Sequence, residues 1–530
     1  MPNPLLPGEL LGARVSVLLE VAYAGGTLRW SDGDAPTDAP GPYLAMSPVD
    51  VEIAFQLLQQ SPDVRAIPVT FDFPREIDVP ALVEQGHDLA AASAEVSLYV
   101  AGRAYVERLV LVRGLLSEPI YNSVGRVTAS VTENPYDDSA VFPPASATVC
   151  ADTWTDYDEA VEGRVYPYPI GTPGVYTDAD NVQAYTTGAP GLLVDVASRT
   201  LLISGAPVVA TTVKVFKLTG TNSPVSASLT VSHGPDLLGR TVATVTLPAG
   251  PGGPTAEEGQ SYWVRWTTGG IRERSGSRSL RGAGELLLWL AERSSLRLDL
   301  AAWGTAAAFL DRYRISGYID DFVRPWDLMA EILALLPVSL IVGPSGLVPV
   351  VWRYDAGPAD VVAHLTDGVD FDIEEGISYE GRDIANEIAI SFAPRADTGE
   401  YLRTRAITGR PAMASENTRN TIRNAHSRAS YDTFGSRAGE SIATDWIHET
   451  GTADQVLRWK AAFMGFPRRV VQGTADASLA WLTAGSVVAI TSARYSLSYR
   501  IGIVSSVSYA GRLFRVSIVL IRQPSTLLPG

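Results

Sequence analysis

The chain has 530 residues, of which 46% are hydrophobic and 19% are charged, and its formal net charge at pH 7 is −16. This composition excludes wholesale disorder, and the length exceeds what one hydrophobic core usually serves, so we expect several domains. The negative charge argues against a sequence-independent nucleic-acid binder, which needs a basic face.

Two further features bear on chemistry and location. Cys150 is the only cysteine, which excludes an internal disulfide framework and a cysteine-cluster metal site. Met1–Leu11 lacks the positively charged start and the apolar run of a signal peptide. The longest apolar stretch, Ile332–Val342, is about half a membrane span and is interrupted by Pro337. We therefore expect the protein to be made and folded in the cytoplasm.

Residues 1–140 predict an N-terminal β-barrel domain. Alternating apolar and polar residues, broken by glycine turns, are typical of antiparallel strands. A helix over Val79–Ala92 is expected to lie across this sheet. The expected strands are Arg14–Tyr23, Thr27–Trp30, Glu95–Val100, Tyr105–Val112 and Gly125–Thr132.

Two different compositions follow. Residues 141–175 are rich in proline, aspartate and aromatic residues and predict an extended but ordered arm, because aromatic side chains need apolar cover. Residues 176–268 return to short strands separated by turn-forming clusters, which predicts a small inserted β-sandwich. The aromatic side chains in or next to the arm include Trp154, Tyr157, Tyr166, Tyr168 and Tyr176.

Residues 284–395 predict a mixed α/β body whose central unit, Ile315–Arg353, is a scaffold without a catalytic polar residue at its centre. Pro325 suits the first turn of a helix, and Pro337 ends that helix. The apolar face of the helix is expected to contain Trp326, Met329, Ala330, Leu333 and Leu336. Two further helices are expected, one beginning at Leu286 and a second covering Ala301–Leu310. A hairpin is expected from the strands Val338–Val342 and Leu347–Trp352.

The last part of the chain divides into a polar and an apolar portion. Residues 396–450 are rich in arginine, asparagine and serine and predict a polar surface arm or a β-extension. Residues 451–530 predict a helix followed by an antiparallel β-barrel. Thr452 and Gln455 have the spacing of a capping box for a helix through Met464, closed by Pro467. The expected strands are Val487–Thr491, Ile501–Ser508 and Leu513–Ile521.

The sequence contains no recognisable catalytic motif. HExxH, GxSxG and P-loop patterns are absent, and no two histidines have the helical spacing of a zinc site. We therefore predict that the protein is not an enzyme and has no catalytic, cofactor-binding or metal-binding residues. The scattered histidines are His87, His233, His364, His426 and His448.

An acidic run beside aromatic residues keeps a glycan-degrading alternative open, because glycosidases act through paired carboxylates. We favour a solvated acidic segment, since the run is local and nothing sets two carboxylates opposite one another. Two aspartate-rich loops, at residues 32–34 and 178–181, lack the glycine and glutamate of an EF-hand and are interpreted as turns, with a calcium or magnesium site of another type as the alternative. Asp320 and Asp321 are interpreted as charge matched to a helix dipole. The acidic run consists of Asp152, Asp156, Asp158, Glu159 and Glu162.

Two groups of arginines lie in polar segments. Neither group has the interleaved aromatic residues that stack nucleic-acid bases. On an acidic protein, such arginines are more typical of a subunit interface, where guanidinium groups meet carboxylates. The groups are Arg272, Arg274, Arg278 and Arg281, and Arg403, Arg405, Arg410, Arg419, Arg423 and Arg428.

Several stretches together resemble the tail hub (baseplate hub, or tail-tip) proteins of long-tailed bacteriophages and gene-transfer agents. That family has a tryptophan-containing helix leading into Leu-Pro, a strand, a glycine turn and a Gly-Leu-x-Pro-Val strand. The matching residues here are Pro325-Trp326, Leu336-Pro337 and Gly346–Val350. Further similar stretches are VGRVTASVTEN at 124–134, GRVYPYPIGTPGV at 163–175, NEIAISFAPRAD at 386–397 and LTAGSVVAITSARYSL at 482–497. The arm reads PIGTPGVY where the family pattern is PIPIVYG, and residues 176–268 have no counterpart.

The resemblance implies a structural virion protein at the tip of a phage tail, assembled in the host cytoplasm. Such a hub is a homotrimer in which two barrel domains per subunit form a pseudo-sixfold ring that adapts the sixfold tail to a threefold tip. Its implied partners are the distal tail protein, the tape measure protein and tail fibre or spike proteins. Such a hub contacts DNA only during genome ejection, and it contacts the host envelope during attachment. The implied role needs no cofactor.

Two alternatives stay open at this point. A glycan-degrading tail component would act through the carboxylates of residues 152–162. A glycan-binding adhesin would use residues 176–268 as its ligand domain, and it could coexist with a hub role for the rest of the chain.

Overall fold

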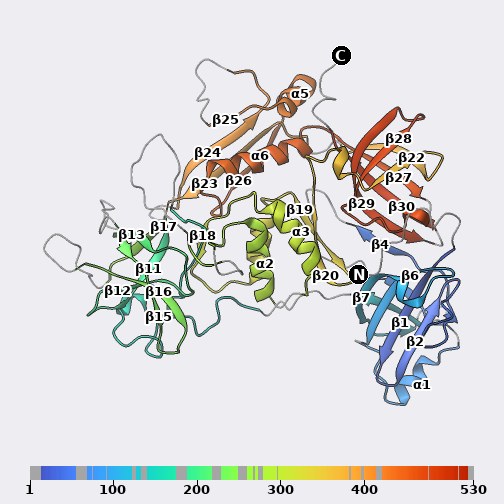
Figure 1. The fold of residues 1–530 in the computed structure, drawn as a ribbon, viewed down its shortest axis with the longest axis horizontal. Coiled ribbons are helices and arrows are strands. Elements are labelled where there is room, and N and C mark those ends of the chain that lie inside the picture. Colours follow the sequence, from blue (N-terminus) through green and yellow to red (C-terminus); the bar gives the residue numbers. More distant parts are fainter. Residues whose placement is uncertain are drawn as a thin grey trace.

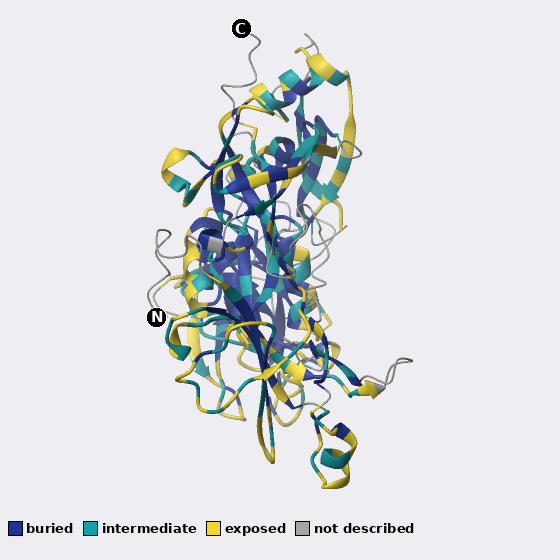
Figure 2. Ribbon diagram, turned by 90° about the vertical axis from the view of Figure 1, so that its right-hand side faces the viewer, coloured by how far each residue is buried: buried dark blue, intermediate teal, exposed yellow. Residues whose placement is uncertain are grey.

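The computed structural model describes residues 14–54, 69–74, 76–90, 92–121, 127–132, 140–174, 188–217, 228–248, 259–266, 269–272, 278–294, 297–380, 384–395, 399–412, 420–475, 477–510 and 513–522. They form a mainly β, multi-domain fold with a few helices, which confirms the predicted fold class. Figure 1 shows curled sheets grouped around a central set of helices. Buried residues run through the middle of the molecule, and exposed residues cover its outer loops (Figure 2).

The N-terminal sheet has the strand order β3-β2-β1-β6-β7-β9-β5, with β8 beside β9. Its neighbours are antiparallel except for the β2–β3 pair. One face is apolar because side chains alternate along each strand, and it buries Trp30 against Phe71 and Phe73. The strands are β1 Val15–Tyr23, β2 Gly26–Ser31, β3 Leu44–Ala45, β5 Val69–Asp72, β6 Ser93–Val100, β7 Leu109–Leu116, β8 Ile120–Tyr121 and β9 Val127–Thr132.

Two sequence predictions for this domain need correction. Helix α1 covers only Val79–Glu84, where a helix to Ala92 was expected; it ends at Gln85, before Gly86 with its φ of +85°. The expected strand Tyr105–Val112 begins instead with a 3₁₀ turn, Tyr105–Glu107, and the strand proper starts at Leu109. Asp38 accepts the Tyr105 N–H at 3.0 Å, and this contact holds the turn out of the sheet.

The C-terminal sheet has the order β21-β28-β29-β30-β27-β22. Its pairs are antiparallel except for β21–β28. The strands are β21 Ala363–Thr366, β22 Phe371–Glu380, β27 Arg468–Ala475, β28 Val487–Ser492, β29 Leu497–Ala510 and β30 Leu513–Leu520. Residues 363–380 thus belong to this sheet, whereas the sequence assigned them to the body at 284–395.

A strand from the N-terminal part of the chain completes the C-terminal sheet. Strand β4, Val51–Ala54, pairs antiparallel with residues 506–509 of β29. The two sheets also share one continuous hydrophobic cluster, to which the N-terminal sheet contributes Trp30 and Val96 and the C-terminal sheet Phe371 and Val507. The two β domains are therefore joined both by backbone hydrogen bonding and by a common core.

Three helices and a hairpin form the centre of the molecule (Figure 1). These are α2 Ala283–Arg293, α3 Leu300–Leu310, α4 Pro325–Leu333, β19 Val338–Gly343 and β20 Gly346–Val351. The predicted hairpin and the helix with Pro325 in its first turn are confirmed. Asp311, just after α3, accepts the Glu285 N–H at 3.1 Å and so caps the first turn of α2.

The buried face of α4 is rotated relative to the sequence expectation. Met329 and Leu333 are buried as expected, but Leu328 and Ile332 are buried as well, while Trp326 and Ala330 are only half-buried. The helix packs against α2 on one side of this stripe. The spacing of apolar residues along α4 is compatible with the burial of either face. Packing against α2 determines which face is buried.

Residues 141–174 are ordered, as expected, but they pack along the central core rather than extending as an arm. Tyr166 and Tyr168 are buried, and Trp154 and Tyr157 contact the same core, whereas Tyr176 lies outside the described residues. Within this segment are the 3₁₀ turn Glu159–Val161 and strand β10, Tyr168–Ile170, which pairs with β18, Gly317–Ile319.

The region expected to be an inserted sandwich contains one seven-stranded sheet of order β14-β13-β17-β11-β12-β16-β15. Its buried residues belong to the same cluster as the central helices, so it shares its core with the body of the protein. The strands are β11 Ala189–Asp195, β12 Thr200–Ser204, β13 Thr212–Lys217, β14 Leu229–Thr230, β15 Ser232–Pro235, β16 Thr241–Thr246 and β17 Tyr262–Trp266.

Residues 384–464 form an α/β subdomain where the sequence predicted the end of the body and a polar arm or β-extension. A four-stranded sheet of order β25-β24-β23-β26 carries helix α6, whose buried Lys460 forms an ion pair with Glu440 of β26. Thr452 lies inside the first turn of α6 and accepts the Arg314 N–H at 3.0 Å, so the predicted capping box is wrong. The elements are β23 Glu387–Pro394, β24 Tyr401–Thr408, β25 Thr421–Ile422, α5 Ala425–Phe434, β26 Ala438–Ala443 and α6 Thr450–Met464.

Candidate functional site

The acidic run at 152–162 stabilises local structure. Asp158 is buried; it accepts the Gly259 N–H at 2.7 Å and the Ala160 N–H at 3.0 Å. Asp156 accepts the Ala197 N–H at 3.0 Å, and Glu162 accepts the Tyr157 hydroxyl at 3.0 Å. Asp152 and Glu159 are exposed. Three of the five carboxylates are thus engaged in fixing the segment to its surroundings.

The aromatic residues beside the acidic run are likewise bound to the protein. Trp154 donates its indole N–H to the Tyr166 hydroxyl at 2.9 Å, and that hydroxyl donates to Asp236 at 3.2 Å. Burial alone would raise the pKa of Asp236, but hydrogen bonds from Arg240 outweigh it and lower that pKa. Trp154 therefore belongs to a buried polar network that joins residues 141–174 to the seven-stranded sheet.

The other acidic loops also have structural roles. Asp32 accepts the Val17 N–H at 2.7 Å, and Asp321 accepts the Phe322 N–H at 2.7 Å. The acidic residue in the first turn of α4 is Asp327, not Asp320 or Asp321. Burial raises the pKa of Asp320. Residues 178–181 lie outside the described part of the chain, and within that part no three His, Cys, Asp or Glu side chains are grouped as metal ligands.

The described histidines lie apart, each in its own environment. His87 packs edge-on against Tyr23, His364 is hydrogen-bonded to Thr491 at 2.8 Å, and His233 accepts the Val208 N–H at 3.2 Å. Burial, followed by the nearby Arg522, lowers the pKa of His426. Burial lowers the pKa of His448 to about 4.

His448 is expected to make the protein less stable as the pH falls. Its pKa drops on folding from 6.5 to about 4, so between these values the unfolded chain binds the extra proton and the folded chain does not. The stabilisation is present above pH 6.5 and is lost toward pH 4, by about 2 kcal/mol between pH 7.5 and 5.0. Between pH 7.5 and 5.0, the midpoint temperature of thermal unfolding should fall less in His448→Gln than in the wild type. Equal shifts would contradict this role for His448.

Most described arginines of the 403–428 group already have partners within the chain. Arg405 forms two hydrogen bonds of 2.9 Å with Asp454, Arg428 pairs with Asp432 at 3.0 Å, and Arg410 pairs with Glu387. Arg274 and Arg419 lie outside the described residues. The subunit interface expected at these arginines therefore stays a prediction.

The stretches that carry the family resemblance meet at junctions between parts of the fold. The Gly346–Val350 strand lies against the 482–497 stretch: a Cβ on Gly485, which has a φ of +91°, would lie 2.6 Å from Val350 Cγ1. The 163–175 stretch reaches α6 and its flank, since the Gly174 N–H donates to His448 Nδ1 at 3.4 Å. Asn386, which opens the 386–397 stretch, is fully buried and binds Ser430, Gly435 and Arg437. No signal in the sequence marked these contacts.

In the described part of the chain, no helix is both long and apolar enough to cross a membrane. Strands β4 and β29 unite the two β domains into one body (Figure 1). This pair of joined β domains is the candidate functional feature.

Comparison with known proteins found similarity only to solved structures, whose descriptions name tail and virion proteins. No protein-family model matches the chain, and no curated protein matches its sequence. The structure is similar to the tail protein from Neisseria meningitidis, with a TM-score of 0.36 and 8% identity over 96% of this chain and 97% of that one. For the 43 kDa tail protein of prophage MuSo2 from Shewanella oneidensis, the TM-score is 0.37 with 9% identity, over 97% and 100%. A chain from the virion of a native gene transfer agent particle gives a TM-score of 0.38 with 12% identity, over 71% and 89%.

Proposed function

We propose that the protein is a structural component of a phage-like tail, a hub in which three copies form a ring at the distal end of the tail tube. The observation that carries this proposal is the β4–β29 pairing. It fixes two curled β domains of one chain side by side, so three copies would present six such domains around one axis. Such a threefold ring would offer one β domain to each of the six subunits around a sixfold tube.

The proposed partners follow from the position at the tube end. The distal tail protein would lie above the ring, tail fibre or spike proteins below it, and the end of the tape measure protein inside it. DNA would pass through only during ejection. With a net charge of −16 per chain, a ring with acidic residues on its inner wall would repel the phosphate backbone and keep the channel free of bound DNA.

A non-enzymatic role agrees with the contacts of the acidic run. Asp156, Asp158 and Glu162 each accept hydrogen bonds that hold the segment in place. A glycosidase needs one carboxylic acid and one carboxylate free to face the two sides of a glycosidic bond. The glycan-degrading alternative would therefore require these residues to exchange their structural partners for substrate.

The proposed assembly is tested by sedimentation velocity and electron microscopy of the purified protein at micromolar concentration and physiological salt. We expect particles with the mass of three chains whose class averages are threefold rings. A species that stays monomeric at all concentrations would contradict the hub. So would release of reducing sugar from host envelope that is abolished by Asp156→Ala and Glu159→Ala, because it would establish the glycan-degrading alternative.

A further inference from the structure

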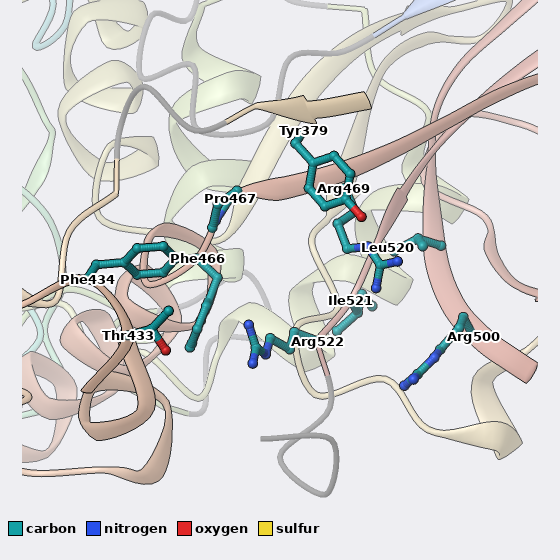
Figure 3. Close-up of a pocket in the computed structure, with 10 residues that line it drawn as sticks. All are labelled: Tyr379, Thr433, Phe434, Phe466, Pro467, Arg469, Arg500, Leu520, Ile521 and Arg522. Carbon is teal, nitrogen blue, oxygen red and sulfur yellow. The ribbon is translucent and has the colours of Figure 1, made fainter. Parts of the chain in front are cut away.

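A pocket of about 420 Å³ lies between the α/β subdomain and the C-terminal sheet (Figure 3). Phe434 of α5 and Phe466, just after α6, form one wall, with their ring centroids 5.7 Å apart. Tyr379 of β22 stands at the other side of the pocket. Segments that are far apart in the sequence thus line one cavity.

Three arginines from different segments point into this region. Arg469 comes from β27, Arg500 from β29, and Arg522 follows β30. Among the described residues, no aspartate or glutamate lines the pocket and none of the three arginines forms an ion pair. The Nε atoms of Arg469 and Arg500 are buried and have no hydrogen-bond partner there. The described lining of the pocket is therefore a concentration of positive charge on an acidic chain.

The aromatic rings hold the guanidinium groups in place. The Arg522 guanidinium carbon lies 3.5 Å from the centroid of the Phe466 ring, and that of Arg469 lies 5.6 Å from the Tyr379 ring. Burial, and then the charge of Arg469, lower the pKa of Arg522. Stacking on the aromatic rings offsets part of the electrostatic repulsion between the guanidinium groups of Arg469 and Arg522. An anion placed between these groups would offset more of it.

The chemistry of the pocket selects a carboxylate. Arginine binds planar carboxylates and phosphates through paired N–H donors, so an oxyanion is the matching ligand. The rings of Phe466 and Tyr379 each have a guanidinium group beside them, which reduces the ring surface left for stacking nucleic-acid bases. An extended polyanion would also meet the repulsion of a chain with net charge −16.

We propose that this pocket accepts an acidic side chain from a second copy of this chain. Each copy carries 58 acidic and 42 basic residues, so a neighbouring copy has a surplus of carboxylates to offer this unpaired cationic site. The contact would also neutralise three arginines at the seam between the subdomain and the C-terminal sheet. This inference rests on the proposed trimer and assigns it one specific contact.

The test compares the oligomerisation of three variants with that of the wild type at 0.15 M salt. In the double variant Arg469→Gln/Arg500→Gln, sedimentation velocity should show at least a tenfold weaker association than in the wild type. The control Arg312→Gln replaces an exposed arginine just after α3 that is paired with Asp355 and should change association less than twofold. Arg522→Gln, at an exposed position, provides a milder variant with an expected severalfold loss in case the double variant does not fold.

A second measurement separates this inference from the hub itself. Citrate, a tricarboxylate probe, should raise the melting temperature of the wild type above that in sodium chloride of equal ionic strength, and the double variant should lose this effect. A wild-type trimer with unchanged association in the variants would overturn the inference and leave the hub standing. A monomeric wild type would overturn the hub, and the carboxylate assignment would then stand or fall with the citrate effect. Stronger stabilisation by phosphate or an oligonucleotide than by citrate would overturn that assignment.

Discussion

Gly284→Ala is expected to lower the stability of the helical centre by about 3 kcal/mol, because overpacking of a close contact forces backbone shifts. Gly284 lies in the first turn of α2, where the helix crosses α3. A Cβ at this position would lie 2.4 Å from the Ala307 Cα and 2.9 Å from the Ala307 Cβ. Neither partner is the end of a flexible side chain, so the helices themselves would have to separate. Differential scanning calorimetry should show a lower transition temperature for the variant.

A glycine on the partner helix provides the matched control. Gly304 lies in α3, is exposed, and has nothing within 4 Å of the position of an added Cβ. Gly304→Ala should therefore stabilise the helix by up to about 1 kcal/mol, since alanine loses less backbone entropy on folding than glycine. If both variants lowered stability equally, helix composition rather than the close approach at Gly284 would be the cause.

Asn386→Ala is expected to destabilise the α/β subdomain by about 3 kcal/mol. The buried side chain donates to the Ser430 hydroxyl at 3.1 Å and to the Gly435 carbonyl at 2.9 Å, and it accepts the Arg437 N–H at 3.0 Å. Alanine would remove all three hydrogen bonds, and each such bond contributes about 0.5–1.5 kcal/mol to stability. Hydrogen exchange should show faster opening of β23 and β26 with little change in the N-terminal sheet.

Asn420→Ala serves as the control for Asn386. Asn420 is an exposed asparagine in the same subdomain, before β25, and its main-chain carbonyl, which alanine keeps, accepts the Ala406 N–H at 2.9 Å. This variant should exchange like the wild type. Normal exchange in Asn386→Ala would show that water or a neighbouring side chain replaces the lost hydrogen bonds, against the structural role proposed for this residue.

The local elements were predictable where turn residues and periodicity agreed. The β19–β20 hairpin follows from apolar runs on both sides of a glycine turn, and α4 follows from Pro325 and an apolar stripe. Helix α5 was missed although Asn424, which caps it by accepting the Ser427 N–H at 2.7 Å, is a usable signal. The arginine-rich composition around it favoured the interpretation as a polar arm.

Other predictions failed because residues far away in the sequence form contacts that local spacing and composition do not reveal. Thr452 and Gln455 have the spacing of a capping box, but the Thr452 hydroxyl binds the Arg314 N–H, 138 residues away. The domain boundary at 395 divides β23 from β24, which pair with each other antiparallel in one sheet. The change of composition at residue 396 suggested a boundary that the pairing of these two strands crosses.

The sequence by itself determined the fold class, the central hairpin, several strands of the N-terminal and C-terminal sheets and the absence of a recognisable catalytic motif, because each depends on residues close together in the chain. Only the tertiary structure decided that β4 joins the C-terminal sheet and that Arg469, Arg500 and Arg522 line one pocket. The physical reason is the same for both. Backbone hydrogen bonds at a strand edge are formed by groups common to all residues, and charges act on whatever folding brings near them.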